Sequence, residues 1–300
     1  MKKIILSAVS IAALTTSALA ADLPSRKAAP AYVPPAAPLW TGFHVGLNAG
    51  GTWGNNSSLT TTTWPMNNFV AANPVYWAYG NTALPGSSNG GFIGGGQVGY
   101  DWQVPYNGMG FVTGVEADIQ GIATSGGNRN ANFVTPGSGA GETVWSNINA
   151  SGNLQYLGTV RGRVGYLVTP TLLVYGTGGL AYGGVSFNVS STKTEYNAAG
   201  TQWVGVGNAN YSNTQVGWTG GGGAEWMFLP NWSAKAEYLY YDLGNVSMTG
   251  VITRVPVLQT GIPANNFTSS TYNGRVNGNL VRAGVNYHFN FASAPVVAKY

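Results

Sequence analysis

The segment Val281-Arg282-Ala283-Gly284-Val285-Asn286-Tyr287-His288-Phe289, near the end of the 300-residue chain, decides the fold. Apolar or aromatic side chains occupy its odd-numbered positions, and polar or small residues occupy the even-numbered ones, which is the period of two of a β-strand. A soluble sandwich would turn the polar face of such a strand to water. A membrane barrel instead turns the apolar face to lipid and the polar face to its lumen.

The same alternation recurs in eight segments, and each is longer than the about 9 to 11 residues that a tilted membrane strand requires. We therefore predict an all-β protein, an eight-stranded antiparallel up-and-down transmembrane β-barrel. The predicted strands cover residues 40–54, 90–104, 109–121, 154–168, 172–187, 215–229, 232–246 and 277–291.

The connections between these segments are of two kinds, and the two kinds alternate strictly. Residues 105–108, 169–171 and 230–231 are tight turns, whereas the other four connections, such as 55–89 and 247–276, are long and polar. Outer-membrane barrels have short periplasmic turns and long extracellular loops. The pattern therefore predicts that both chain ends and the three turns lie on the periplasmic side.

Composition excludes several other classes of protein. Charged residues make up 7% of the chain and aromatic residues 12%, and the mean hydropathy is +0.01. After the leader, no apolar run approaches the about 18 residues of a membrane helix, and so many aromatic residues are not typical of a disordered chain. The chain has no cysteine, which excludes a lipid-modified cysteine and a disulfide framework. We predict no cofactor.

The chain begins with the pattern of a secretory signal peptide: Lys2 and Lys3, an apolar stretch over residues 4–14, and Ala18-Leu19-Ala20 as the cleavage site. We predict a signal peptide (1–20), a Pro/Ala-rich periplasmic linker (21–39), a barrel (40–291) and a C-terminal tail (292–300), with the mature protein in the outer membrane of a Gram-negative bacterium. Removal of the leader leaves 11 cationic and 9 acidic residues, a net charge of +2, which is too weak to indicate binding of nucleic acid.

Charged side chains recur on the polar face of the predicted strands. Pairing residues across the turn at 230–231 so that their numbers sum to 460 places Glu225 opposite Lys235. The interior of an eight-stranded barrel is just filled by side chains, so buried charges require partners of opposite sign. We therefore predict an ion-pair network in the lumen, formed by Glu116, Asp118, Arg161, Arg163, Glu225, Lys235, Glu237 and Arg282.

The two histidines of the chain are predicted to meet. His44 lies at the start of the first strand and His288 at the end of the last, and closure of the barrel makes these strands neighbours. A paired site for a metal or a haem iron is one interpretation, and rim histidines that hydrogen-bond to backbone or water are the other. The glycines Gly94, Gly96 and Gly99 match a dinucleotide fingerprint formally, but no helix pattern follows them. We predict no enzymatic activity.

Several segments together resemble a known family, the alphaproteobacterial outer-membrane surface antigens, a porin-like group of small barrels that includes haem-binding and rhizobial members. The resemblance implies an abundant eight-stranded barrel with a role in envelope integrity or host contact, in a membrane of lipid and lipopolysaccharide. The segments that carry it are residues 18–24 (ALAADLP), 40–46 (WTGFHVG), 159–166 (TVRGRVGY), 236–244 (AEYLYYDLG) and 281–289 (VRAGVNYHF).

The resemblance also implies that the outer-membrane insertion machinery reads a C-terminal aromatic residue, for which Phe291 and Tyr300 are both candidates. We predict a non-enzymatic envelope protein whose lumen is filled by the charged network. The alternatives are a narrow porin-like channel, a surface receptor that binds haem or a host partner, and a soluble secreted adhesin.

Overall fold

A computed structural model describes residues 39–54, 58–65, 82–84, 90–106, 109–124, 127–136, 141–197, 200–256 and 265–289. The predicted signal peptide, nearly all of the linker, and the C-terminal tail lie outside these residues, and so do both candidates for the C-terminal insertion signal. Among the described residues, no helix is long and apolar enough to cross a membrane.

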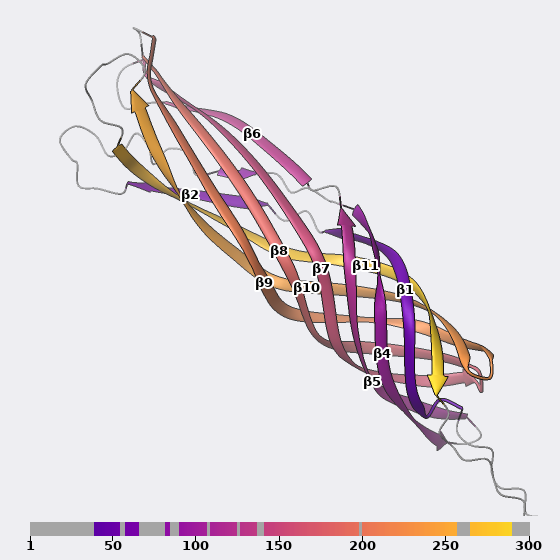
Figure 1. The fold of residues 1–300 in the computed structure, drawn as a ribbon. Helices are drawn as coiled ribbons and strands as arrows, with labels where there is room; N and C mark the ends of the chain where they lie inside the picture. Colours follow the sequence, from indigo (N-terminus) through magenta and orange to yellow (C-terminus); the bar gives the residue numbers. More distant parts are fainter. Residues whose placement is uncertain are drawn as a thin grey trace, which may run out of the picture. The chain divides into compact units, whose positions relative to one another are not determined.

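Eight antiparallel strands form a closed ring (Figure 1). Each strand pairs with the next along the ring, and the last pairs back with the first, so the ring has no free edge. Around the ring, the strands are β1 (Gly42–Gly54), β4 (Gly90–Tyr106), β5 (Met109–Thr124), β7 (Thr143–Thr169), β8 (Leu172–Asn197), β9 (Gly200–Leu229), β10 (Trp232–Pro256) and β11 (Asn265–Phe289). The predicted eight-stranded barrel is confirmed.

The strand register agrees with the prediction from the tight turn. Lys235 lies opposite Glu225, and Glu237 lies opposite Gly223. At the closing seam, where β1 meets β11, His44 lies directly opposite His288. The alternation of side chains therefore carries through the whole ring, because a slip of one residue would turn every side chain to the other face.

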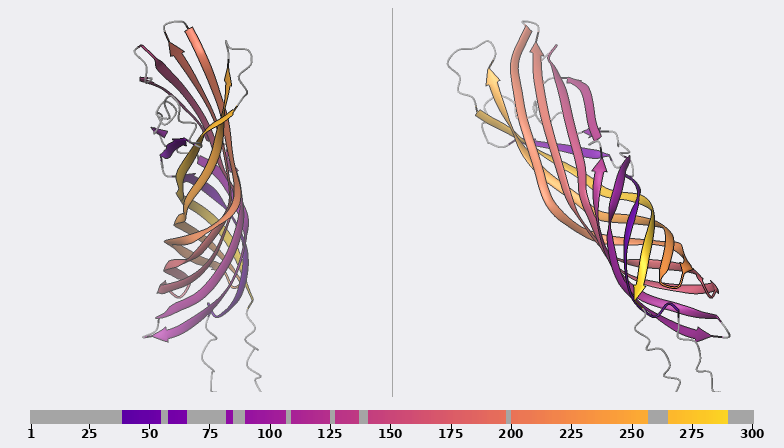
Figure 2. Two further views of the ribbon diagram at one scale, coloured as in Figure 1. Left: turned by 90° about the vertical axis from the view of Figure 1, so that its left-hand side faces the viewer. Right: turned by 45° about the vertical axis from the view of Figure 1, so that its right-hand side comes forward.

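The predicted segments are too short at the outer ends of five of the eight strands, β7 to β11. Strands β7 to β11 have 25 to 30 residues each, whereas β1, β4 and β5 have 13 to 17. The longer strands continue well beyond the closed ring (Figure 2). Most of the predicted loop 247–276 is therefore strand. Three short strands add to the extension: β2 (Leu59–Pro65), β3 (Thr82–Leu84) and β6 (Gly127–Pro136).

The polarity of the two faces inverts along β7. In the lower part of β7, Val160 and Val164 are exposed on the outside, and Arg161 and Arg163 are buried inside. In its upper part the apolar Ile148 is buried inside, and Asn149 is exposed. A lipid-facing wall requires apolar groups outside, and a wall in water requires them inside. The inversion marks the outer boundary of the membrane.

An apolar band covers the outside of the ring below this boundary. Leu47 is 74% exposed and Val164 is 63% exposed, values that a water-soluble protein would rarely give to such side chains in a contiguous band. Aromatic side chains gather at its periplasmic edge, as in the interfacial girdles of membrane barrels. This edge includes Phe43, Trp102, Tyr106, Phe111, Tyr166, Trp226, Phe228, Trp232 and Phe289.

The interior of the extension above the membrane is packed largely with apolar side chains. Its buried side chains include Ile148, Val189 and Tyr272. Lys193 of β8 is buried among them, with its Nζ 3.4 Å from Thr63 Oγ1, and burial lowers the pKa of its ammonium group to about 8. The extension is therefore a packed structure and not a set of loose loops.

Candidate functional site in the barrel lumen

Nine charged side chains lie inside the ring, and each is at most 5% exposed. They come from six strands, because every strand in the ring turns alternate residues inward. All eight residues that we predicted for the lumen network are among them, and the ninth is Asp101. The set is Asp101, Glu116, Asp118, Arg161, Arg163, Glu225, Lys235, Glu237 and Arg282.

Glu116 lies at the centre of the network. Its carboxylate is 2.6 Å from a guanidinium nitrogen of Arg161 and 2.8 Å from Nζ of Lys235. Arg282 and Arg163 also approach it, at 3.6 Å and 3.8 Å. One carboxylate thus contacts cations from three other strands, which compensates the cost of removing these charges from water.

Arg161 and Arg282 form one layer of the network with the carboxylates of Asp118 and Glu237. Arg161 donates to Asp118 at 3.0 Å and to Glu237 at 2.8 Å. Arg282 donates to the same two carboxylates, at 2.9 Å and 2.8 Å. The two guanidinium groups are therefore held in place by shared carboxylates.

Arg163 forms a second layer, nearer the periplasmic end. Its guanidinium group donates to both carboxylate oxygens of Asp101, with an Nε to Oδ1 distance of 2.7 Å, and to Glu225 at 2.8 Å. Ser233 and Asn286 donate to the other oxygen of Glu225. Each carboxylate of this layer is thus held by several donors.

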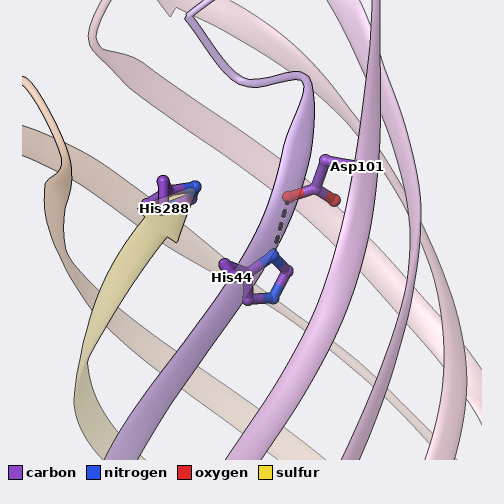
Figure 3. A group of neighbouring side chains, drawn as sticks. All are labelled: His44, Asp101 and His288. Carbon is purple, nitrogen blue, oxygen red and sulfur yellow. Dashed lines mark ion pairs between the residues drawn. The ribbon is translucent and has the colours of Figure 1, made fainter. Parts of the chain in front are cut away.

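The two histidines border this layer, and they lie side by side as predicted. Their ring centroids are 5.4 Å apart, and both side chains are buried. His44 Nδ1 is 3.2 Å from Oδ2 of Asp101, on the neighbouring strand β4 (Figure 3). Gly99 makes room for His44, since a Cβ there would lie 2.5 Å from its ring carbon Cε1. Gly94, Gly96 and Gly99 all lie within strand β4, and the close approach to His44 explains Gly99.

Apolar side chains close the lumen on both sides of the charged network. Toward the periplasm, Trp40 is fully buried in a cluster with Leu167, Leu173 and Met227. Its indole Nε1 donates to the carbonyl of Pro170 at 3.0 Å, and its ring packs edge-on against His288. Toward the outside, a second cluster fills the lumen with side chains such as Ile93, Leu157, Leu239 and Leu280. The charges are sealed between two apolar layers.

Asp101 is the functional candidate that our sequence analysis missed. It lies between two aromatic residues in Val98-Gly99-Tyr100-Asp101-Trp102, and aromatic residues at this spacing indicate the lipid face of a strand. Its position has the parity of Gln97 and Gly99, which point inward. Strict use of the alternation would have placed its carboxylate in the lumen.

A closed ring of strands with an apolar outer band, aromatic edges and a charged interior defines an integral outer-membrane β-barrel. Comparison with known proteins agrees with this class. The chain belongs to the family described as outer membrane protein beta-barrel domain, whose model matches residues 6–289. The predicted family resemblance and the location in the outer membrane are confirmed.

Relatives of this chain include proteins of two alphaproteobacteria, Brucella and Rhizobium. The chain is 35% identical to the 31 kDa outer-membrane immunogenic protein of Brucella melitensis, over 96% of this chain and 100% of that protein. It is 32% identical to a 22 kDa outer membrane protein of Rhizobium leguminosarum, over 49% of this chain and 52% of that protein. Among solved structures, OprG of Pseudomonas aeruginosa is similar over 83% of this chain and 97% of that protein, with 11% identity and a TM-score of 0.38.

Proposed function

We propose that this protein is a sealed, non-enzymatic barrel that anchors its extracellular extension in the outer membrane and contributes to envelope integrity. The observation that carries the proposal is the filling of the lumen. Nine charged side chains form ion pairs across the lumen, and apolar clusters cover them on both sides. Solutes that cross a pore require a water-filled path, and this packing supplies none within the described residues.

The same packing argues against hydrolysis in the lumen. A general acid or base must reach substrate or water, whereas Glu116, Asp118 and Glu225 are at most 5% exposed and contact arginine or lysine. Their contacts are those of a structural network. Lipid and lipopolysaccharide are the expected surroundings of the apolar band, and contact with the insertion machinery is expected during assembly.

Planar-bilayer recording tests the sealed lumen. We expect the purified protein, folded as shown by faster gel mobility before boiling, to give no sustained single-channel openings across a range of voltages. A general diffusion porin recorded in the same membranes is the positive control. Steady openings from the folded, unboiled protein would show that the lumen conducts and that the narrow-channel alternative is right.

A surface receptor is a second candidate, and the outer face of the extension favours it. Amide side chains form cross-strand rows there: Asn130 and Asn149 lie opposite each other, and the row continues through Ser190 to Asn208. The hollow that they line has a volume of about 360 Å³. Paired amide donors and acceptors, with Arg129 as the one charged residue of the lining, suit a largely neutral, hydroxyl-rich ligand such as a glycan.

Binding of neutral oligosaccharides, measured on a glycan array, tests this candidate. We expect the folded protein to bind a subset of neutral glycans and the variant Asn130→Ala/Asn208→Ala to lose that binding, because it removes amides from two of the strands. Asn213→Ala, which removes an exposed amide of β9 outside the lining of the hollow, is the matched control. Equal binding by both variants would place the ligand elsewhere.

A further inference from the structure

We propose that His44, Asp101 and His288 bind one divalent transition-metal ion, which links strands β1, β4 and β11 at the closing seam of the barrel. One ligand atom from each of these three residues lies within 4.8 Å of the others, and all three side chains are buried. Figure 3 shows the two imidazole rings and the carboxylate around one small space.

The contact between His44 and Asp101 has the geometry of two ligands that share an ion. The distance from Nδ1 to Oδ2 is 3.2 Å, yet within the part of the chain that the structure describes, Nδ1 has no hydrogen-bond partner of acceptable angle. Two ligands of a tetrahedral metal at bonds of about 2.0 Å lie about 3.3 Å apart. The ligand atom of His288 lies within 4.8 Å of the other two, so a bound ion would draw the His288 ring closer.

The surroundings supply the outer partners that metal ligands usually have. The second nitrogen of His44, Nε2, lies 3.4 Å from a carboxylate oxygen of Glu116. Ser233 Oγ and a carboxylate oxygen of Glu225 lie 2.9 Å and 3.3 Å from Nε2 of His288. Arg163 donates to both carboxylate oxygens of Asp101, so a metal ion would share Oδ2 with this guanidinium group. The carboxylate partners of the two histidines hold the imidazole rings in orientation and raise their affinity for the metal, and Arg163 holds the carboxylate in orientation.

The charge of the lumen favours a cation at this place. Among the described residues the network contains five carboxylates and four arginine or lysine side chains, so one negative charge is left over. Two of the carboxylates, Asp101 and Glu225, contact the histidines directly. A bound divalent cation offsets this negative charge and leaves a net charge of +1, and imidazole with carboxylate is a ligand set for zinc, copper or nickel.

The site suits a bare ion and not a haem group. His44 is fully buried and His288 is 2% exposed, and Trp40 packs edge-on against the His288 ring from the periplasmic side. A porphyrin would have to displace these contacts. Of the two ligands that the histidine pair suggested, the geometry therefore points to the metal ion.

The chain makes a sharp experiment available, because it has only two histidines and no cysteine. Protein without a histidine tag is refolded into detergent micelles with Zn²⁺ or Cu²⁺ present, since the buried site closes on folding, and is then freed of loose metal. We expect one ion per chain by elemental analysis. With Cu²⁺, electron paramagnetic resonance should show coupling to two imidazole nitrogens, and the ion should raise the midpoint of thermal unfolding.

Variants separate this site from adventitious binding. His44→Asn and His288→Asn should each weaken binding by more than the about 10- to 100-fold that loss of an outer partner costs, and lose the metal-dependent rise in the midpoint. Asp242→Asn, which removes a buried carboxylate outside the network, is the matched control and should bind as wild type. Folding of each variant is checked by gel mobility before and after boiling. The proposal is wrong if wild-type protein retains no ion, if its copper spectrum lacks imidazole nitrogen coupling, or if the histidine variants keep the ion.

Discussion

Replacing Arg161 with methionine is expected to destabilise the folded barrel by about 3 to 5 kcal/mol, the usual cost of removing one partner from a buried ion-pair network. Arg161 contacts the carboxylates of Glu116, Asp118 and Glu237 at 2.6 to 3.0 Å and is 2% exposed. Methionine keeps much of the volume but leaves these carboxylates without one of their cations. The measurement is urea unfolding of protein refolded in phospholipid vesicles.

Two further variants show whether burial and charge balance set the cost. Arg275→Gln removes the cation of the pair with Asp242, but the Arg275 side chain is 57% exposed, so little change is expected. Glu116→Gln should cost less than Arg161→Met, because it leaves four carboxylates facing four cations in the network, whereas Arg161→Met leaves five facing three. Equal losses from all three variants would contradict the network as a source of stability.

Replacing Gly179 with alanine is expected to destabilise the barrel by about 2 to 3 kcal/mol, because the added Cβ would overlap the backbone of the neighbouring strand. Gly179 lies opposite Arg161 across the pair of strands β7 and β8. A Cβ at this position would lie 2.7 Å from the Cα of Arg161 and closer still to the carbonyl oxygen of Val160. Both are backbone atoms, so neither can move aside cheaply.

Gly162 is the matched control for Gly179, since it is in the same pair of strands but has no atom within 4 Å of an added Cβ. Gly162→Ala should be neutral or should stabilise the protein by about 0.4 to 1 kcal/mol, through the smaller entropy of the unfolded chain. Urea midpoints and the fraction refolded into vesicles check both variants. A loss from Gly162→Ala as large as that from Gly179→Ala would show that strand glycines matter for flexibility and not for close approach.

Local pattern was sufficient to predict the ring of strands. In the segment 281–289 the alternation separates lumen from lipid residue by residue, and the tight turn at Pro230 and Asn231 sets the register that places Lys235 opposite Glu225. Both signals are local in the chain, since strand period and turn length require no knowledge of distant residues. The contact between His44 and His288 was predicted from closure of the barrel alone, because closure makes the first and last strands neighbours.

The extracellular extension could not be predicted in the same way. In water, the upper part of β7 turns Asn147 and Asn149 outward and Ile148 and Ala150 inward, which is alternation of the opposite sense. Its many Asn, Ser and Thr residues are also typical of loops, so composition favoured a loop where the structure has strand. The packing of five long strands around a shared apolar interior decides the matter, and that interior forms only in the folded protein.

The sequence by itself determined that this protein is an outer-membrane barrel of eight strands, which residues face lipid, and which charges enter the lumen, because each follows from a period of two and the length of the turns. Only the tertiary structure decided which charges meet. Asp101 joins Arg163 and the two histidines because strands distant in the chain become neighbours in the closed ring. The packing of the lumen and the proposed metal site at its seam depend on distances between strands, which no local pattern specifies.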